Sequence, residues 1–283
     1  MELHQSMALK LLKEKYWLQS LIGGNEIINS IEPTAIIDQS AQLGNNISIG
    51  PNAIIEHDVS INDNTSIAAN AHIKPYTTIG KNCKIFNGAI LGEVPQDLKF
   101  DGEKSELIIG DSTTIREYCT LNRGTNATGK TIIGNECLLM AYVHIAHDCI
   151  VGNNSILANS VQVGGHVEIG HHVTIGGMTP IHQFCKIGNY SFTGGGFRIV
   201  QDIPPYILAM HEPLKYSGLN VVGLRRNNFS SEVRKNLKAV YQLIFNSSLN
   251  LTQAINKIKK DFNITTEIQE ILDFIENSDR GLI

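Results

Sequence analysis

The sequence predicts a parallel β-helix followed by a small α-helical domain. From Ala35 the chain divides into segments of six residues, and in 24 of 25 such segments the third residue is aliphatic; Thr193 is the exception. The first residue is nearly always compact. A period of six matches neither the 3.6-residue period of an α-helix nor the two-residue period of a solvated strand. It matches a triangular solenoid, in which three segments make one coil and equivalent residues stack 18 positions apart.

Two polar segments, 94–106 and 125–130, interrupt the period. We expect both to loop out of a β-helix that spans residues 31–205, with Pro204 and Pro205 at its end. Loops on a rigid scaffold are common places for functional residues. Glycine often follows the third place, and we expect these glycines to turn the corners with unusual backbone dihedral angles.

The two ends of the chain have a helical pattern. Residues 206–283 contain three segments with helical apolar spacing, and we expect them to form a C-terminal domain that covers the last coil. Thr266 and Gln269 have the spacing of a capping box. Residues 1–30 form an N-terminal extension, with an amphipathic helix expected over residues 7–22.

Cysteine usage argues against a disulfide framework and a cysteine-rich zinc site, because the number is odd and no Cys-x-x-Cys pair occurs. All five stand in the first, inward place of a segment, so we interpret them as packing residues rather than nucleophiles. They are Cys83, Cys119, Cys137, Cys149 and Cys185.

Composition excludes several functional classes. The net charge is −4 and no run of lysine or arginine occurs, whereas a non-specific nucleic-acid binder needs a basic stripe. No apolar stretch approaches the ~20 residues that span a bilayer. Charged residues interrupt the N-terminal helix and no cleavage site follows it, unlike a secretory signal. We expect a cytoplasmic protein without a nucleic-acid partner or a membrane span.

Six of the ten histidines lie between positions 144 and 182. His147 occupies the fifth place of its segment and directly precedes Asp148; Gly165 follows one full coil later on the same face. An adjacent carboxylate can fix the tautomer of an imidazole and raise its basicity. The residues therefore predict His147 as a general base. Surface positions without a function are expected for His57, His72, His171 and His172.

Two alternatives remain open on spacing alone. His144, His147 and one of His166, His171 or His172 form a candidate zinc site with an open fourth position, as in a carbonic anhydrase. The other alternative is a non-catalytic scaffold that binds partners through its flat faces. The histidine cluster and the two loops argue against the scaffold.

Several motifs resemble the bacterial UDP-N-acetylglucosamine O-acyltransferase family, whose members catalyse the first step of lipid A synthesis. They are GEVPQDLKF, NRGT, HIAHDCIVGN, GGMTPIHQFCKIG, QDIPPY and the terminal RGLI, in a match that begins near Ile31. The resemblance implies left-handed coils and a homotrimer with active sites between neighbouring prisms. It also implies two substrates, UDP-N-acetylglucosamine and a 3-hydroxyacyl chain on acyl carrier protein, with no metal or cofactor.

The resemblance also implies roles for matched residues. His147 would take the proton from the 3-hydroxyl of the glucosamine ring, Asp148 would orient His147, and the Gly165 N–H would stabilise the oxyanion. The substrate-binding residues that it implies are Asp97 and Lys99 for the sugar nucleotide, His144, His166, His182 and Gln183 in the cleft, Asn220 and Arg226 for uridine and phosphate, and Gly195 for the acyl chain. A glycine at position 195 leaves the channel open, which favours a longer chain.

Three positions depart from the family pattern. Asn122 stands where some members have a histidine, Val222 stands where some have a glutamate, and Asn227 stands where some have a second arginine. We therefore expect the nucleotide contacts to differ in detail. The rival within the class is the N-acyltransferase acting two steps later, which carries a large N-terminal uridine-binding domain. About thirty residues precede the repeat here, too few for such a domain.

Overall fold

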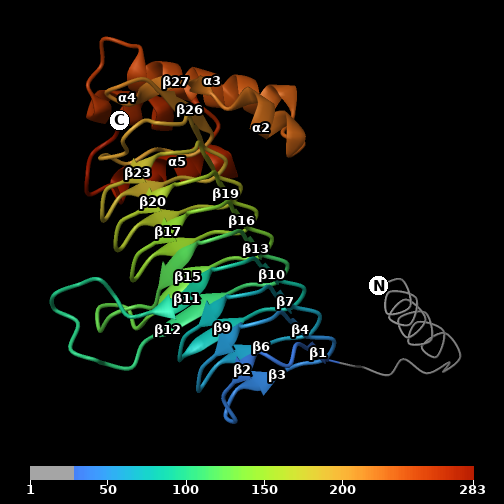
Figure 1. The fold of residues 1–283 in the computed structure, drawn as a ribbon. Helices are drawn as coiled ribbons and strands as arrows, with labels where there is room; N and C mark the ends of the chain where they lie inside the picture. Colours follow the sequence, from blue (N-terminus) through green and yellow to red (C-terminus); the bar gives the residue numbers. More distant parts are fainter. Residues whose placement is uncertain (1–28) are drawn as a thin grey trace, which may run out of the picture.

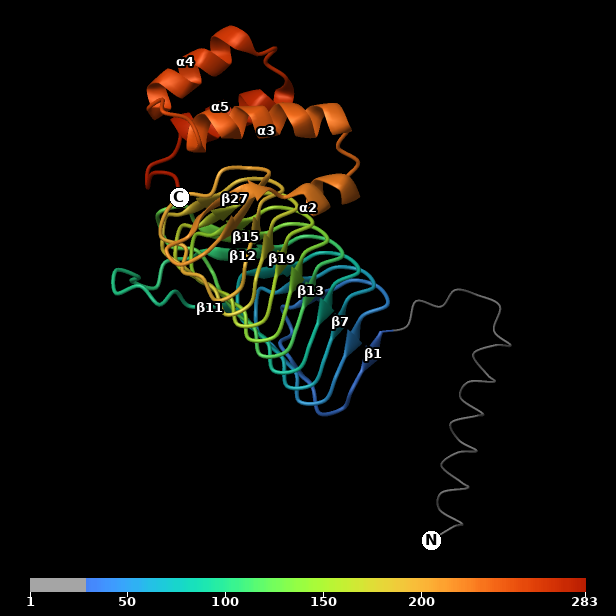
Figure 2. The same cartoon turned by 90° about the horizontal axis from the view of Figure 1, so that it is seen from above.

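The structure is a computed structural model that describes residues 29–283. Short strands stack into a three-sided prism, and α-helices gather at its C-terminal end (Figures 1 and 2). The helix expected over residues 7–22 lies outside the described residues. Within the described part of the chain, no helix has the length and apolar character needed to cross a bilayer.

Three sheets form the faces of the prism, and all their strand pairs are parallel except the last pair of sheet A. Sheet A contains β1 (Ser30–Ile31), β4 (Ser48–Ile49), β7 (Ser66–Ile67), β10 (Lys84–Ile85), β13 (Thr114–Ile115), β16 (Leu138–Leu139), β19 (Ile156–Leu157), β22 (Thr174–Ile175), β25 (Phe192–Thr193), β26 (Ile207–Met210) and β27 (Lys215–Leu219). Sheet B contains β2 (Ile36–Ile37), β5 (Ile54–Ile55), β8 (His72–Ile73), β11 (Ile90–Glu93), β14 (Thr120–Asn122), β17 (His144–Ile145), β20 (Gln162–Val163) and β23 (Pro180–Ile181). Sheet C contains β3 (Gln42–Leu43), β6 (Ser60–Ile61), β9 (Thr77–Ile79), β12 (Glu106–Ile109), β15 (Lys130–Ile133), β18 (Ile150–Val151), β21 (Glu168–Ile169) and β24 (Lys186–Ile187).

The strand register confirms that three segments make one coil. Ser48 pairs with Ser66, which stands at the equivalent position of the next coil in sheet A. Two coils are longer than this, because Lys84 pairs with Thr114 and Thr114 pairs with Leu138. The extra residues belong to the two insertions, which leave the coils on either side in register. The fold is the parallel β-helix that the repeat predicts, with the left hand that the family resemblance implies, followed by α-helices.

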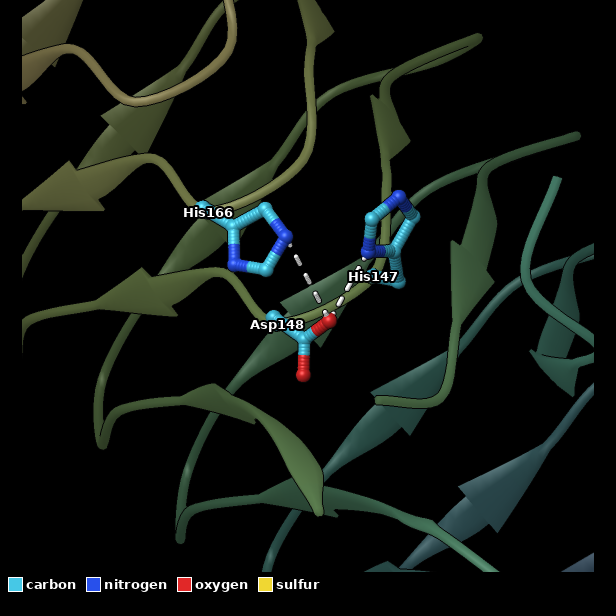
Figure 3. Close-up of side chains that lie close together, drawn as sticks. All are labelled: His147, Asp148 and His166. Carbon is cyan, nitrogen blue, oxygen red and sulfur yellow. Dashed lines mark hydrogen bonds and ion pairs between the residues drawn. The ribbon is translucent and has the colours of Figure 1, made fainter. Parts of the chain in front are cut away.

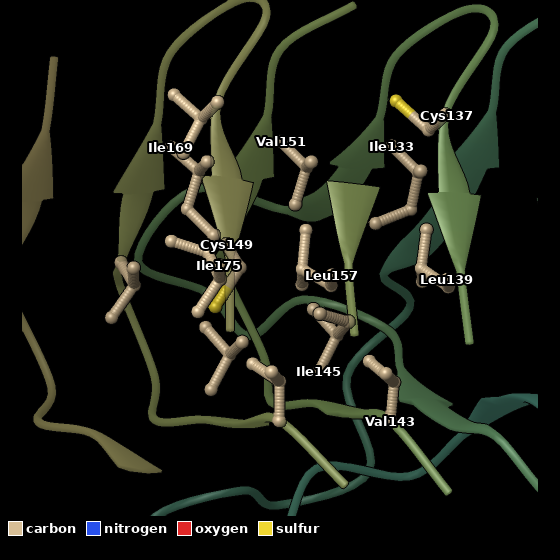
Figure 4. Packing of buried hydrophobic residues seen from close by; sticks show 14 of the residues in the cluster. Ile133, Cys137, Leu139, Val143, Ile145, Cys149, Val151, Leu157, Ile169 and Ile175 are labelled. Atoms are coloured by element: carbon tan, nitrogen blue, oxygen red, sulfur yellow. The ribbon is translucent and has the colours of Figure 1, made fainter. Parts of the chain in front are cut away.

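The core consists of the first- and third-place side chains, which point into the prism from all three sheets (Figure 4). Ile145 and Cys149 are fully buried, and every cysteine of the chain is buried and unpaired. Burying one aliphatic side chain contributes roughly 1.5–3 kcal/mol, so repeated stacking of such residues provides a continuous apolar axis. The packing role predicted for the cysteines is confirmed.

The corners correct one expectation about glycine. The residue in the left-handed region is the sixth of most segments, and it is usually not glycine; examples are Asn64 with a φ of 59° and Asp148 with a φ of 60°. Asparagine and aspartate tolerate this conformation better than most residues. Most fourth-place glycines serve close packing instead: a Cβ on Gly50 would lie 2.7 Å from the backbone nitrogen of Ala69. Gly92, with a φ of 83°, has the unusual dihedral angle that was expected.

Sheet A continues beyond the expected end of the solenoid at residue 205. Strand β26 pairs in parallel with β25, and β27 returns antiparallel to β26. The consecutive prolines Pro204 and Pro205 therefore lie inside the chain segment that joins two strands of one sheet.

The last coil is covered by helices α2 (Val221–Arg226), α3 (Ser231–Phe245), α4 (Leu251–Asp261) and α5 (Thr266–Glu276). The buried Tyr241 hydroxyl on α3 donates to the Pro205 carbonyl at 2.6 Å, which ties this helix to the coil end. The capping box predicted at Thr266 is wrong: Thr265 is the N-cap of α5, and the capping box is formed on α4 by Asn250 and Gln253.

Candidate active site

Both insertions leave the prism at the edge between sheets B and C, which we call the B–C edge. The first, residues 94–105, joins β11 to β12, and the second lies between β14 and β15. His147 and Asp148 lie in the next turn of the same edge, between β17 and β18. The solenoid therefore brings both loops and the predicted base to one side of the molecule.

His147 and Asp148 form a hydrogen-bonded pair (Figure 3). The Nδ1 atom of His147 lies 2.8 Å from Oδ2 of Asp148, and the exposed fractions of the two side chains are 13% and 0%. An ionised carboxylate only accepts hydrogen bonds, so Nδ1 carries the proton that it donates. The Nε2 atom of a neutral imidazole is then free to accept a proton, as general-base catalysis requires.

The second insertion surrounds the Asp148 carboxylate with donors. The Thr125 N–H donates to Oδ1 at 3.0 Å, the Thr125 hydroxyl donates to Oδ2 at 2.7 Å, and the Thr128 hydroxyl also donates to Oδ1. Burial acts to raise the pKa of this carboxyl, but hydrogen bonds from Thr128, Thr125 and His147 outweigh burial and hold the pKa below its usual 3.8. Asp148 is therefore ionised at neutral pH.

The sequence interpretation missed these threonines. The spacing of the repeat could have indicated them. Gly124 is the last residue of its six-residue segment and lies at the same corner as Asp148, one coil earlier. The second insertion begins there and is therefore placed beside the carboxylate.

Gly165 lies against the imidazole of His147, as the stacking of successive coils predicts. A Cβ at position 165 would lie 2.7 Å from Cε1 and 2.8 Å from Nε2 of His147, so any larger residue would displace this ring. The Gly165 N–H makes no hydrogen bond within residues 29–283. It is therefore available to donate to a ligand.

His166 extends the cluster by one coil. Its ring meets that of His147 edge to face, with centroids 5.1 Å apart, and stacks on Phe184 at 4.6 Å. Its Nε2 atom lies 3.8 Å from Oδ2 of Asp148, beyond hydrogen-bonding distance. The stack fixes the plane of His166 beside the imidazole of His147.

A metal could be held by only one group of three potential ligands in the described part of the chain, namely His147, Asp148 and His166. The ligand set expected for a zinc hydratase differs, because His144, His171 and His172 lie outside this group. The Nδ1 atom of His147 is already directed at Asp148 by the hydrogen bond between them. The donor set is better suited to a proton-transfer pair than to a three-histidine site.

The chain shows extensive similarity to known proteins. Residues 202–283 match the profile described as "Udp N-acetylglucosamine O-acyltransferase; Domain 2", and residues 40–75 and 130–165 match "Bacterial transferase hexapeptide (six repeats)". It is 50% identical to the acyl-(acyl-carrier-protein)–UDP-N-acetylglucosamine O-acyltransferase of Chlorobaculum parvum, over 90% of this chain and 97% of that protein. The protein of the same name from Thiobacillus denitrificans is 44% identical, over 90% and 99%. The chain belongs to the UDP-N-acetylglucosamine O-acyltransferase family.

Solved structures agree with this assignment. The UDP-N-acetylglucosamine acyltransferase of Bacteroides fragilis superimposes with a TM-score of 0.88 at 46% identity, covering 89% of this chain and 99% of the other. A structure from Acinetobacter baumannii gives a TM-score of 0.87 at 45% identity, covering 89% and 99%. The resemblance predicted from sequence motifs is confirmed, and O-acyltransferase membership decides against both the scaffold and the zinc hydratase.

Three other residues expected to bind substrate, His144, His182 and Gln183, lie on or directly after strands of sheet B. His144 is on β17, where its Nδ1 atom contacts the Thr120 hydroxyl at 2.8 Å, and burial lowers its pKa. His144 is therefore a neutral hydrogen-bonding group at neutral pH. His182 and Gln183 are exposed at the end of β23, two coils beyond the His147 turn.

The first insertion, whose sequence contains Asp97 and Lys99, projects away from the prism (Figure 1). The Asp97 carboxylate accepts a hydrogen bond from the Lys99 backbone N–H at 3.0 Å, which stabilises a turn within the loop. Asn122, a departure from the family pattern, donates from Nδ2 to the Val94 carbonyl at 2.8 Å and so anchors the base of this loop. The neighbouring Arg123 places its guanidinium 5.5 Å from the Phe100 ring.

Three expected substrate residues do not lie at the B–C edge. Gly195 lies at the corner between sheets A and B, where a Cβ added to it would lie 2.9 Å from the Gly177 carbonyl oxygen. Asn220 caps α2 and donates from Nδ2 to the Tyr190 carbonyl at 2.9 Å, while Arg226 is exposed in the last turn of that helix. One chain therefore presents the expected substrate residues on separate sides.

Proposed function

We propose that this O-acyltransferase transfers a 3-hydroxyacyl chain from acyl carrier protein to the 3-hydroxyl of UDP-N-acetylglucosamine, with His147 as the general base. The observation that carries the proposal is the pair formed by His147 and an ionised, fully buried Asp148, with Gly165 against the imidazole. Relatives at 44–50% identity bear the name of this reaction.

The reaction proceeds by one proton relay. Nε2 of His147 accepts the proton of the sugar hydroxyl while the oxygen forms a bond to the thioester carbonyl carbon. The Gly165 N–H donates to the oxygen that becomes negative. The C–S bond then breaks, and the imidazolium returns the proton to the departing thiolate. General-base catalysis of this kind contributes typically ~10²–10⁴-fold.

We further propose a homotrimer in which each active site lies between two prisms. The corner between sheets A and B exposes a column of apolar side chains, with Tyr142 58% and Met178 75% exposed. Tyr118 stacks on Tyr142 with centroids 5.4 Å apart. Exposed apolar columns of this kind are typical of protein interfaces. Gly195 lies at this corner, so trimer formation brings it toward the B–C edge of a neighbour.

Asp97 and Lys99 contact the sugar nucleotide in this proposal, together with His166, Gln183, Asn220 and Arg226. A lysine near the diphosphate is electrostatically favourable. Gly195 leaves room for an acyl chain longer than ten carbons. Acyl-chain profiling of the purified enzyme checks this last point, and exclusive use of a ten-carbon donor contradicts it.

The test is an assay with UDP-N-acetylglucosamine and a panel of 3-hydroxyacyl carrier proteins, comparing the wild type with His147→Ala. We expect 3-O-acylated product from the wild type and almost none from the variant. Transfer by His147→Ala at the wild-type rate contradicts the proposed base, and product acylated elsewhere contradicts the proposed acceptor.

A further inference from the structure

All the hydrogen-bond acceptor positions of the Asp148 carboxylate are occupied. A carboxylate offers about four acceptor positions. At Oδ1 these are filled by the Thr125 N–H and the Thr128 hydroxyl, and at Oδ2 by the Thr125 hydroxyl and His147. Three of the four donors come from the second insertion, and only one position remains for the base.

The backbone of Asp148 is held as well. Its N–H donates to the Thr131 hydroxyl at 2.8 Å, which fixes the left-handed corner from which the carboxylate projects. Thr131 follows the second insertion directly. The same short stretch of chain thus holds both the main chain and the side chain of Asp148.

We propose that Thr125 and Thr128, the threonine pair, are positioning residues for the acyl-transfer reaction. They act through Asp148: by filling its other acceptor positions they leave a single direction for the His147 N–H, and this sets both the tautomer and the plane of the imidazole. This inference rests on the proposed role of His147 and extends it to a segment that never touches the reacting atoms.

The Thr128 hydroxyl has two neighbouring acceptors, the Asp148 carboxylate and the Lys130 carbonyl at 2.9 Å. It has one proton to donate. Because the Asp148 carboxylate is ionised and the Lys130 carbonyl is neutral, the carboxylate is the stronger acceptor and takes that proton. Thr128 is itself an exposed residue, so a substitution there removes the hydroxyl with little change to packing.

The second insertion also contacts the first. The Asn126 N–H donates to the Glu103 carboxylate at 3.0 Å, and the Glu106 N–H donates to the Gly129 carbonyl at 2.9 Å. The segment that orients the base is therefore attached to the loop that carries Asp97 and Lys99. A displaced second insertion is expected to disturb both.

The experiment compares Thr128→Val with Thr128→Ser in the full-length enzyme, and uses Thr78→Val at an exposed position of β9 as a matched control. Thr128→Val should lower kcat by about tenfold. Removing a donor leaves more of the carboxylate charge to stabilise the imidazolium, so the acid limb of the kcat/KM profile should move to higher pH. Thr128→Ser restores the hydroxyl and should restore both values, and Thr78→Val should match the wild type.

The pH profile of kcat/KM distinguishes a change in the orientation of His147 from a loss of folded protein. A partly unfolded variant loses activity by the same factor at every pH, whereas a reoriented pair moves the acid limb. A Thr128→Val enzyme with wild-type kcat and an unmoved limb overturns the inference, as does a loss that serine fails to rescue. The role of His147 is tested separately: activity retained by His147→Ala contradicts the general base, whatever Thr128 variants do.

Discussion

Gly165→Ala tests the contact between the base and the neighbouring coil. The new Cβ would lie 2.7 Å from Cε1 of His147, whereas ordinary contacts begin near 3.4 Å, so the ring must retreat by about 0.7 Å. The φ of Gly165 is outside the left-handed region, so alanine is compatible with the backbone there. The variant also keeps the N–H that we assign to the oxyanion. The perturbation is therefore almost purely a displacement of the imidazole.

The expected loss follows from this displacement. A misplacement of about 1 Å in a catalytic group can reduce the rate by ~10²-fold, which is about 2.7 kcal/mol of activation free energy. A shift of about 0.7 Å should therefore lower kcat between ~10- and ~100-fold. The assay is the initial rate of acyl transfer at saturating donor and acceptor, with thermal unfolding measured on the same sample. A Gly165→Ala enzyme with wild-type kcat and an unchanged Tm refutes the assigned geometry.

Three further outcomes are expected. The pKa of Asp148 is lowered in the folded state, so the ionised carboxylate stabilises the fold above the unfolded pKa of 3.8, and this contribution is lost as the pH falls. The difference in Tm between the wild type and Asp148→Asn should therefore shrink in acid. A difference in Tm that does not change with pH contradicts this prediction. Burial raises the pKa of Cys119 and Cys149 to about 12, so native enzyme at neutral pH should react slowly with a thiol reagent and keep its activity; rapid modification contradicts the packing role. Ile145→Ala should lower the free energy of unfolding by roughly 2–5 kcal/mol in urea titration, since Ile145 is fully buried; a loss below about 1 kcal/mol contradicts tight stacking along the axis.

Much of the fold followed from one periodic constraint. Inward first- and third-place residues must stack once per coil, so the sequence determines which residues share a face without further information. This arithmetic correctly placed Gly165 beside His147. It could not assign the corner conformation to the right residue, because fourth-place glycines and sixth-place asparagines both satisfy the turn pattern, and only the approach of the next coil separates them.

The site was less accessible to sequence reasoning for two physical reasons. The second insertion has no period, so its path around Asp148 depends on side-chain hydrogen bonds from Thr125 and Thr128. Gly195 lies at another corner of the prism than His147, and Arg226 lies on the C-terminal helix α2. Their relation to the base depends on how copies of the chain assemble, which stacking within one chain does not determine.

Chemical rescue tests the central role of His147 most directly. In a His147→Ala enzyme, free imidazole can occupy the vacated space beside Asp148 and accept the proton in place of the missing ring. We expect the variant to lose ~10²–10⁴-fold in the rate of acyl transfer. Added imidazole should restore part of this rate in proportion to its neutral form. A His147→Ala enzyme that transfers acyl chains at the wild-type rate without imidazole contradicts the account.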